Sequence, residues 1–209
     1  MLVLIKGAGD LATGTAVRLY RAGIKVVMTE VARPTAVRRT VAFSQCMYDG
    51  AAQVEGIAAR RAEDARAARR ALERGEVPVL CDPEAAILRE LPFDGVVDAI
   101  LAKRNLGTAI TDAPVVLALG PGFTAGVDCH GAVETMRGHD LGRLLTRGSA
   151  VPNTGVPGDV GGYTTQRIIR APADGVFEPL AAIGQRVEEG QPVARVAGRT
   201  ARAQLKSEA

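Results

Sequence analysis

The sequence of 209 residues is poor in aromatic side chains, with no Trp, three Tyr and four Phe. Proteins that bind single-stranded nucleic acid stack bases on aromatic side chains, so this class is disfavoured. The net charge is only +3 at neutral pH, which argues against a surface for duplex DNA or RNA. We therefore expect no nucleic-acid partner.

Cysteine is also scarce. Cys46, Cys81 and Cys129 are odd in number and far apart, and no C-x-x-C pair exists, which argues against a disulfide framework or a zinc finger. Long apolar runs are absent from the start of the chain, where five apolar residues precede Lys6. That run is too short for a signal peptide or a membrane span. We expect a cytoplasmic protein with no membrane contact.

What the sequence does contain is an ordinary globular composition, 47% hydrophobic and 23% charged, which favours a folded core of one or two domains. Apolar runs predict strands over 2–5, 24–29, 53–59, 77–80, 96–101 and 114–119. Helical patterns between them cover 11–21, 34–43, 63–74 and 83–90. This alternation predicts an α/β fold with a Rossmann-like, doubly wound, mostly parallel sheet and helices on both faces.

The composition changes after about residue 127. Two further β-segments are predicted over 129–136 and 141–146, and a Gly/Pro-rich stretch follows. Short runs at 167–170, 175–178 and 192–196 then alternate with turns, which predicts a small β module. We expect a Rossmann-like, cofactor-binding domain over 1–148, a linker over 149–164 and the β module over 165–209.

A glycine-rich turn follows the first predicted strand. Gly7 and Gly9 match the first two glycines of the dinucleotide motif G-x-G-x-x-G/A, with Ala12 at the third position. Such a turn brings backbone N–H groups and a helix N-terminus close to a phosphate. The alternative is a tight strand–helix turn without a ligand. Gly14 completes the glycine-rich segment.

Two acidic residues accompany this turn. Glu30 ends the second predicted strand, 21 residues after Gly9, at the distance where an acid holds a ribose hydroxyl. Asp10 follows Gly9 directly, and its carboxylate would repel a phosphate unless it caps the helix or binds a cation.

A second glycine loop, Gly120-Pro-Gly122-Phe-Thr124-Ala-Gly126, follows the strand predicted over 114–119. Free N–H groups and the Thr124 hydroxyl would suit an anionic group at the carboxyl edge of the sheet. A glycine turn that only leaves the sheet explains the pattern equally well.

A polar segment follows the strand predicted over 96–101. Lys103, Asn105 and Thr108 would reach the same edge of the sheet. Asp98 lies inside that apolar strand and needs a partner there. We predict Lys103 and Asn105 as its partners, in either a structural ion pair or a substrate-binding cluster.

Both histidines lie in the segment that follows. Asp128, His130, Glu134 and His139 suggest metal ligands, but the histidines are nine residues apart, a spacing that fits neither a helix nor a short zinc loop. We expect surface histidines and no metal site.

Taken together, five segments resemble a known family. They are KGAGDLATG at the start, RRTVAFSQ at 38–45, VDAILAKRNLGT at 97–108, LALGPGFTAGVDCHGAVETMRGH at 117–139 and PNTGVPGDVGG at 152–162. The combination, which covers nearly the whole chain, resembles the YqeB-type accessory proteins of selenium-dependent molybdenum hydroxylase systems. The resemblance implies a Rossmann-like domain and a role in maturing a molybdenum hydroxylase. The implied partners are that client enzyme or its maturation machinery.

The resemblance names no catalytic residue and no proven cofactor. NAD(P) and a molybdopterin-type nucleotide both carry the phosphates that the glycine turns would suit. A stand-alone NAD(P)-dependent oxidoreductase is the alternative, but the chain has no Tyr-x-x-x-Lys pair and neither histidine has an evident acid–base setting.

The segment over 170–196 resembles one half of a biotinyl/lipoyl-type hammerhead barrel, whose second half should begin near 201–205. A carrier module is a further alternative, but no Lys lies within 165–197 and the only one after Lys103 is Lys206. We therefore expect no covalent cofactor. A lone half would leave an apolar face and open strand edges, so we expect it to pack on the first domain or to pair in a homo-oligomer.

Overall fold

The computed structural model describes residues 1–156 and 158–203. Its contacts divide the chain into two compact units, Met1–Asn153 and Thr154–Ala209. Within the described residues, no helix is long and apolar enough to cross a membrane.

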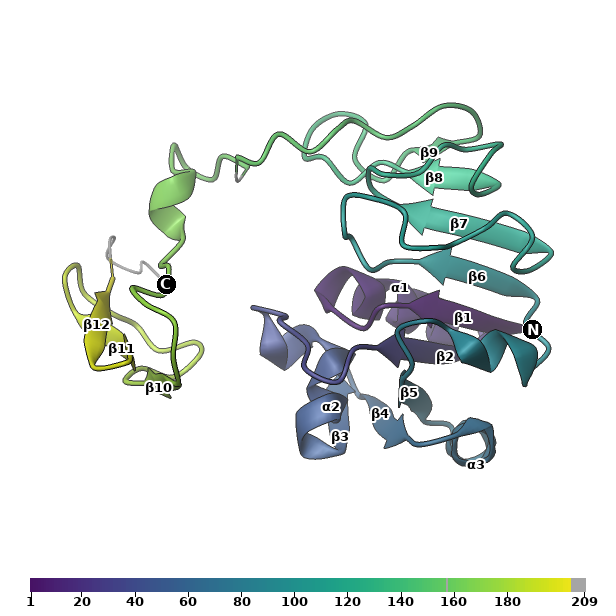
Figure 1. Ribbon diagram of the computed structural model, residues 1–209, viewed down its shortest axis with the longest axis horizontal. Coiled ribbons are helices and arrows are strands. Elements are labelled where there is room, and N and C mark those ends of the chain that lie inside the picture. The colour runs from purple at the N-terminus through teal and green to yellow at the C-terminus, as the bar shows by residue number, and fades with distance from the viewer. Residues whose placement is uncertain (157, 204–209) are drawn as a thin grey trace. The chain divides into compact units, whose positions relative to one another are not determined.

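The first unit is built on a nine-stranded sheet in the order β3-β4-β5-β2-β1-β6-β7-β8-β9 (Figure 1). The strands from β4 to β8 in this order run parallel, and β3 and β9 are antiparallel at the two edges. The strands are β1 (Leu2–Lys6), β2 (Lys25–Glu30), β3 (Ala51–Val54), β4 (Ile57–Ala62), β5 (Val77–Cys81), β6 (Gly95–Asp98), β7 (Val115–Leu119), β8 (Gly131–Val133) and β9 (Leu144–Leu145).

The central strands read as continuous apolar runs because both of their faces are covered. On one face Val3 and Ile5 of β1 pack in the same core cluster as Ala12 and Ala16 of helix α1 (Asp10–Arg21). On the other face Leu4 packs with residues of helix α3 (Ala65–Glu73). The predicted α/β fold with a mostly parallel sheet is confirmed.

The helix predicted over 63–74 corresponds to α3, which begins two residues later and ends one residue earlier. The side chain of Asp64 caps its first turn by accepting a hydrogen bond from the backbone N–H of Ala67 at 2.6 Å. Gly75 follows its last turn with a φ of +74°, the left-handed conformation that commonly ends a helix.

The helix predicted over 34–43 is wrong. This region contains only the short 3-10 turns η1 (Arg39–Val41) and η2 (Phe43–Gln45), followed by the one-turn helix α2 (Cys46–Asp49). Two of its backbone N–H groups bond outside the segment. That of Phe43 donates to Thr13 Oγ1, and that of Ser44 donates to the carbonyl of Ala8. These bonds hold the segment against α1 and the first glycine turn instead of closing a helix.

Three other predicted elements differ in type or length from those in the structure. The strand predicted over 53–59 is the hairpin of β3 and β4, with positive φ at Glu55 and Gly56, as a two-residue type I′ turn requires. The helix predicted over 83–90 is the 3-10 turn η3 (Ala86–Arg89). The strand predicted to reach residue 101 ends at Asp98, and Leu101 has a φ of +60°.

The connections from β6 to β9 differ from a regular doubly wound fold. They are loops in Figure 1, and the described residues between these strands include no helix. The apolar residues Phe123, Ala125 and Cys129 of these loops are buried in the core cluster that also contains Val116 and Ala118 of β7. Over β6 to β8, loop packing therefore replaces helix packing on the face that α3 covers further along the sheet.

The second unit contains a three-stranded antiparallel sheet of β10 (Phe177–Pro179), β11 (Pro192–Val196) and β12 (Arg199–Arg202). The predicted small β module is therefore confirmed, although 167–170 is not a strand and follows the 3-10 turn η4 (Thr165–Arg167). Strand β12, which begins after a turn at Ala197 and Gly198, was not predicted from the sequence. The expected start of a second half-barrel, near 201–205, lies partly outside the described residues. Lys206 lies outside them.

Candidate functional site

The candidate site lies at the carboxyl edge of the large sheet. Strands β1, β2, β6 and β7 are parallel neighbours that end at Lys6, Glu30, Asp98 and Leu119. The loops that leave these strands therefore begin at one edge. The strand order reverses between β1 and β6, since β2 follows β1 on one side and β6 lies on the other. Open α/β sheets bind ligands at such a switch point.

Gly7 forms the close approach between the ends of β1 and β6. Its φ is +93°, and a Cβ atom added there would lie 2.9 Å from the carbonyl oxygen of Ala99. Its N–H donates to the carbonyl of Thr29 at 2.9 Å. A side chain at position 7 would therefore strain the backbone and push β6 away, so Gly7 shapes the turn.

Gly9 is different because it faces open space. It is the N-cap of α1, has extended backbone angles, and no atom lies within 4 Å of the position of an added Cβ. No side chain caps the helix there. The N-terminus of this 12-residue helix carries partial positive charge and unsatisfied N–H groups. An anionic group of a ligand has both room and electrostatic stabilisation at this point.

Asp10, the acid beside Gly9, is neutralised by a cation. Its carboxylate forms an ion pair with the guanidinium of Arg38, which comes from the segment that packs on the glycine turn. Because the Arg38 side chain is 66% exposed, the pair adds little stability. Its consequence is electrostatic, since the repulsion that Asp10 would exert on a phosphate is reduced.

Glu30 holds the glycine turn. Its two carboxylate oxygens accept hydrogen bonds from the backbone N–H of Ala8 at 3.0 Å and that of Val31 at 2.8 Å. The sequence predicts that this acid holds a ribose hydroxyl; in the structure each of its oxygens accepts one backbone N–H, and because a carboxylate accepts several hydrogen bonds the ribose role stays a prediction. The N–H of Ala8 is likewise satisfied within the chain and is not free for a phosphate.

Gly14 lies one turn inside α1, exposed, with no atom near the position of an added Cβ. Since backbone N–H groups beyond the first turn of a helix bond to carbonyls within it, Gly14 offers a ligand no free donor.

The predicted partners of Asp98 are wrong. Its Oδ2 accepts a hydrogen bond from the hydroxyl of Thr108 at 2.6 Å, and that hydroxyl accepts one from Lys6 Nζ, also at 2.6 Å. Lys6 Nζ lies 4.0 Å from Asp98 Oδ2, and all three side chains are buried. Lys6 was not among the predicted partners of Asp98, although a Lys at the end of an apolar strand directly before the glycine turn is a visible signal.

Asn105 positions Thr108. Its Oδ1 accepts hydrogen bonds from the N–H groups of Gly107 and Thr108, and its Nδ2 donates to the carbonyl of Thr108. Because these bonds fix the loop, the Thr108 hydroxyl is held between Lys6 and Asp98.

Lys103 lies in the exposed loop that leaves β6. It has a φ of +64°, and Leu101 has one of +60°, a conformation that is strained for residues with a side chain and concentrates at functional sites. This loop touches the second glycine loop, since a Cβ at Gly122 would lie 2.6 Å from the Cα of Arg104. The structure thus brings Lys103 and Gly122 together.

Several N–H groups of the second glycine loop are not free. Those of Gly120 and Gly126 donate to the carbonyls of Val133 and Cys129, and that of Thr124 donates to Asp128 Oδ2. The Thr124 hydroxyl lies 3.2 Å from the hydroxyl of Ser149. These bonds to residues outside the loop hold it in place, and it packs against the loop that carries Lys103.

No group of three or more His, Cys, Asp or Glu side chains among the described residues is placed to hold a metal ion. His130 Nδ1 accepts a hydrogen bond from the N–H of Val116 at 3.0 Å. Glu134 is buried, and its two oxygens accept backbone N–H groups of Met136 and Val151, each at 2.7 Å. Burial raises the pKa of Glu134, but the bonds from Val151, Met136 and Thr135 outweigh it, so the pKa is lowered overall.

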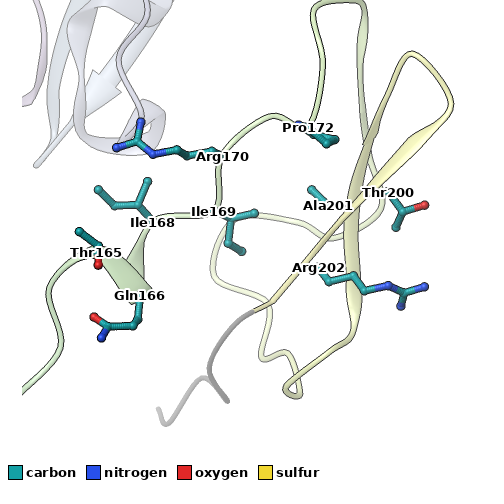
Figure 2. Close-up of a pocket in the computed structure, with 9 residues that line it drawn as sticks. All are labelled: Thr165, Gln166, Ile168, Ile169, Arg170, Pro172, Thr200, Ala201 and Arg202. Atoms are coloured by element: carbon teal, nitrogen blue, oxygen red, sulfur yellow. The ribbon is translucent and has the colours of Figure 1, made fainter.

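The second unit has its own surface pocket of about 420 Å³, drawn in Figure 2. Arg170 and Arg202 are among its lining residues, but Figure 2 shows their guanidinium groups pointing away from each other. Arg202 donates to the carbonyl of Gly190. The two cations therefore do not converge on one ligand.

Comparison with known proteins gives one named relative. The chain is 54% identical over 193 residues to the uncharacterized protein YqeB of Escherichia coli (strain K12). The aligned region is 92% of this chain and 36% of that protein, so the chain spans about a third of the relative's length. No protein-family model matches the chain, and no solved structure does. The match supports the resemblance to YqeB-type proteins and assigns no activity.

Proposed function

We propose that this chain is part of an accessory protein that matures a molybdenum hydroxylase. It binds a nucleotide or a molybdopterin-type cofactor at the carboxyl edge between β1 and β6. The client enzyme or its maturation machinery is the partner. The resemblance of five sequence segments to YqeB-type accessory proteins supports the accessory role, and the similarity to YqeB supports that resemblance without assigning a role.

The observation that carries the binding proposal is the open N-terminus of α1. Gly9 faces empty space at the switch point of a parallel sheet, which is where such sheets bind phosphate-bearing ligands. The pairing of Asp10 with Arg38 lowers the repulsion that would otherwise oppose an anion there.

The residues at this edge divide into two roles. Gly9, the first turn of α1 and Lys103 face the ligand and hold its phosphate groups. Gly7 and Glu30 shape the first turn, while Asn105, Gly120, Gly122 and Thr124 fix the neighbouring loops. A bound molybdopterin would supply the dithiolene that coordinates molybdenum, and this chain would hold its phosphate and deliver it.

The test is mass spectrometry of small molecules released from freshly purified protein, followed by calorimetry with the compound found and with NAD and NADP. The variant Gly9→Val places a side chain in the space assigned to the phosphate, so we expect affinity to fall at least about tenfold. Arg18→Ala, at the far end of α1, is the matched control and should bind as the wild type does. Equal affinity of Gly9→Val and wild type would refute the site.

A stand-alone NAD(P)-dependent oxidoreductase is the second candidate. The strand order β5-β2-β1-β6-β7-β8 matches that of dinucleotide-binding sheets, which favours it. Transfer of a hydride between NAD(P) and simple alcohols, aldehydes or hydroxy acids, measured at 340 nm, would support this candidate over the accessory role.

We further propose that the chain forms a homo-oligomer through its β module. Val176, Phe177 and Ile183 are 88%, 62% and 63% exposed, and Phe177 and Ile183 line an apolar pocket of about 330 Å³. Sedimentation of the full chain should show an oligomer that Phe177→Ser weakens. A monomer in both proteins would contradict the proposal.

A further inference from the structure

A cavity of about 340 Å³ opens beside the buried Lys6 at the carboxyl edge of the sheet. Its wall also includes Ala86, Leu88 and Arg89 from the segment after β5, and Gly107 and Asp112 from the segment after β6. Neither Gly9 nor Asp10 lines it. The cavity is therefore separate from the open N-terminus of α1.

The buried cation in the wall of this cavity comes from the end of β1. The Lys6 side chain is 5% exposed, and within residues 1–156 and 158–203 its Nζ makes one hydrogen bond, to Thr108 Oγ1. An ammonium group has three N–H donors, so two remain for solvent or an occupant. Burying those donors without partners is costly, which favours an occupant that supplies acceptor oxygens.

The surroundings of Lys6 set the charge of that occupant. Asp98 lies 4.0 Å from Nζ behind the Thr108 hydroxyl, so the ammonium is already partly compensated. Glu84 and Asp112 line the cavity with negative charge, and Arg89 adds one exposed cation. These carboxylates repel a doubly charged phosphate about twice as strongly as a singly charged carboxylate, so the cavity favours a singly charged carboxylate on Lys6.

Asp112 adds a second recognition group. Its Oδ2 accepts a hydrogen bond from the N–H of Ala109 at 3.0 Å, which fixes the carboxylate in the cavity wall. An ionised carboxylate accepts several hydrogen bonds, so Asp112 is able to accept one from a hydroxyl or amino group of the occupant.

We propose that this cavity binds a small organic carboxylate that carries a hydroxyl or amino donor. Lys6 Nζ anchors the carboxylate of the ligand, and Asp112 accepts the bond from the donor. Thr108 and Asp98 are positioning residues that hold the Lys6 ammonium in place. This site is additional to the proposed cofactor site and does not depend on it.

Calorimetry on the full chain tests the proposal with glycolate, glycine and L-lactate as probes, acetate as the probe without a donor, and inorganic phosphate. We expect glycolate or lactate to bind more tightly than acetate and phosphate. The variant Ala86→Phe fills the cavity from an exposed position and should weaken binding at least about tenfold. Lys6→Met should also weaken binding at least about tenfold. Its matched control is Lys25→Met, because Lys25 is an exposed Lys at the first residue of β2, at the opposite edge of the sheet.

Lys6→Met leaves Asp98 buried without its cation, so this variant is at risk of misfolding. The binding of Ala86→Phe and Asp112→Asn therefore decides whether the proposal holds. Asp112→Asn retains an oxygen for the Ala109 N–H and should remove the preference for glycolate over acetate. The proposal is overturned if no carboxylate binds at about 10 mM, if phosphate binds more tightly than every carboxylate, or if Ala86→Phe binds glycolate like the wild type.

Discussion

Lys6 on β1 and Asp98 on β6 are joined through one hydroxyl group. The Thr108 hydroxyl accepts from Lys6 Nζ and donates to Asp98 Oδ2, both at 2.6 Å. All three side chains are buried, so each charge depends on this bridge in place of water.

Thr108→Val keeps the shape of this side chain and removes the hydroxyl. Because a buried ammonium and a buried carboxylate would each lose a hydrogen bond, we expect a loss of about 1–3 kcal/mol in the free energy of unfolding. Urea denaturation measures it. Thr111→Val, at an exposed position of the same loop, should stay within about 0.5 kcal/mol of the wild type. Equal stabilities of the two variants would contradict the bridge.

The two glycines of the first turn should respond differently to alanine. Gly7→Ala forces a side chain into a φ of +93° and against the Ala99 carbonyl, so we expect a loss of about 1–3 kcal/mol. Gly9→Ala meets no atom and has an allowed backbone conformation, so its stability should change by about 1 kcal/mol or less. Thermal denaturation distinguishes them, and a reversed order would show that the turn is built differently.

The lowered pKa of Glu134 predicts that part of the free energy of unfolding is lost at acid pH. Its pKa is lowered in the folded protein because backbone N–H bonds outweigh burial. The carboxylate therefore stabilises the fold above its ordinary pKa, and this contribution is lost as the pH falls below that value. At pH 7, Glu134→Gln should cost about 1–3 kcal/mol, and the difference from the wild type should shrink at acid pH. Denaturant titrations at several pH values test this, and a constant difference would contradict it.

The three cysteines should differ in reactivity. Burial raises the pKa of Cys46 to about 12, and burial followed by the charge of Asp128 raises the pKa of Cys129. Since the thiolate is the reactive form, both should be inert in the native protein. Cys81 is exposed and should react alone with a thiol reagent. In urea all three should react, and rapid native labelling of Cys46 would contradict the buried placement.

Much of the α/β core was predictable because its signals are local. Buried parallel strands give continuous apolar runs, as in the strand predicted over 114–119, which matches β7 (Val115–Leu119) closely. The helix predicted over 63–74 likewise corresponds to α3 (Ala65–Glu73). Gly7, Lys103 and Gly122 each follow a predicted strand. Because parallel strands end at one edge of a sheet, their placement at the carboxyl edge was predictable from the sequence.

Hairpin turns were harder to predict from sequence. β3 and β4 meet at Glu55-Gly56, and β11 and β12 meet at Ala197-Gly198, with positive φ at all four residues. Asn or Asp normally marks the first position of such a turn. Glu and Ala give no such signal, so both hairpins were missed although Gly marks the second position.

The sequence by itself determined the fold class, the glycine turns and the edge of the sheet where they gather, because strand periodicity and glycine conformations are properties of neighbouring residues. Tertiary structure alone decided how the polar groups at that edge pair. It placed Lys6 with Asp98, Glu30 with Ala8 and Arg38 with Asp10. These partners are far apart in the chain, and only the packing of the strands and loops sets which donor reaches which acceptor.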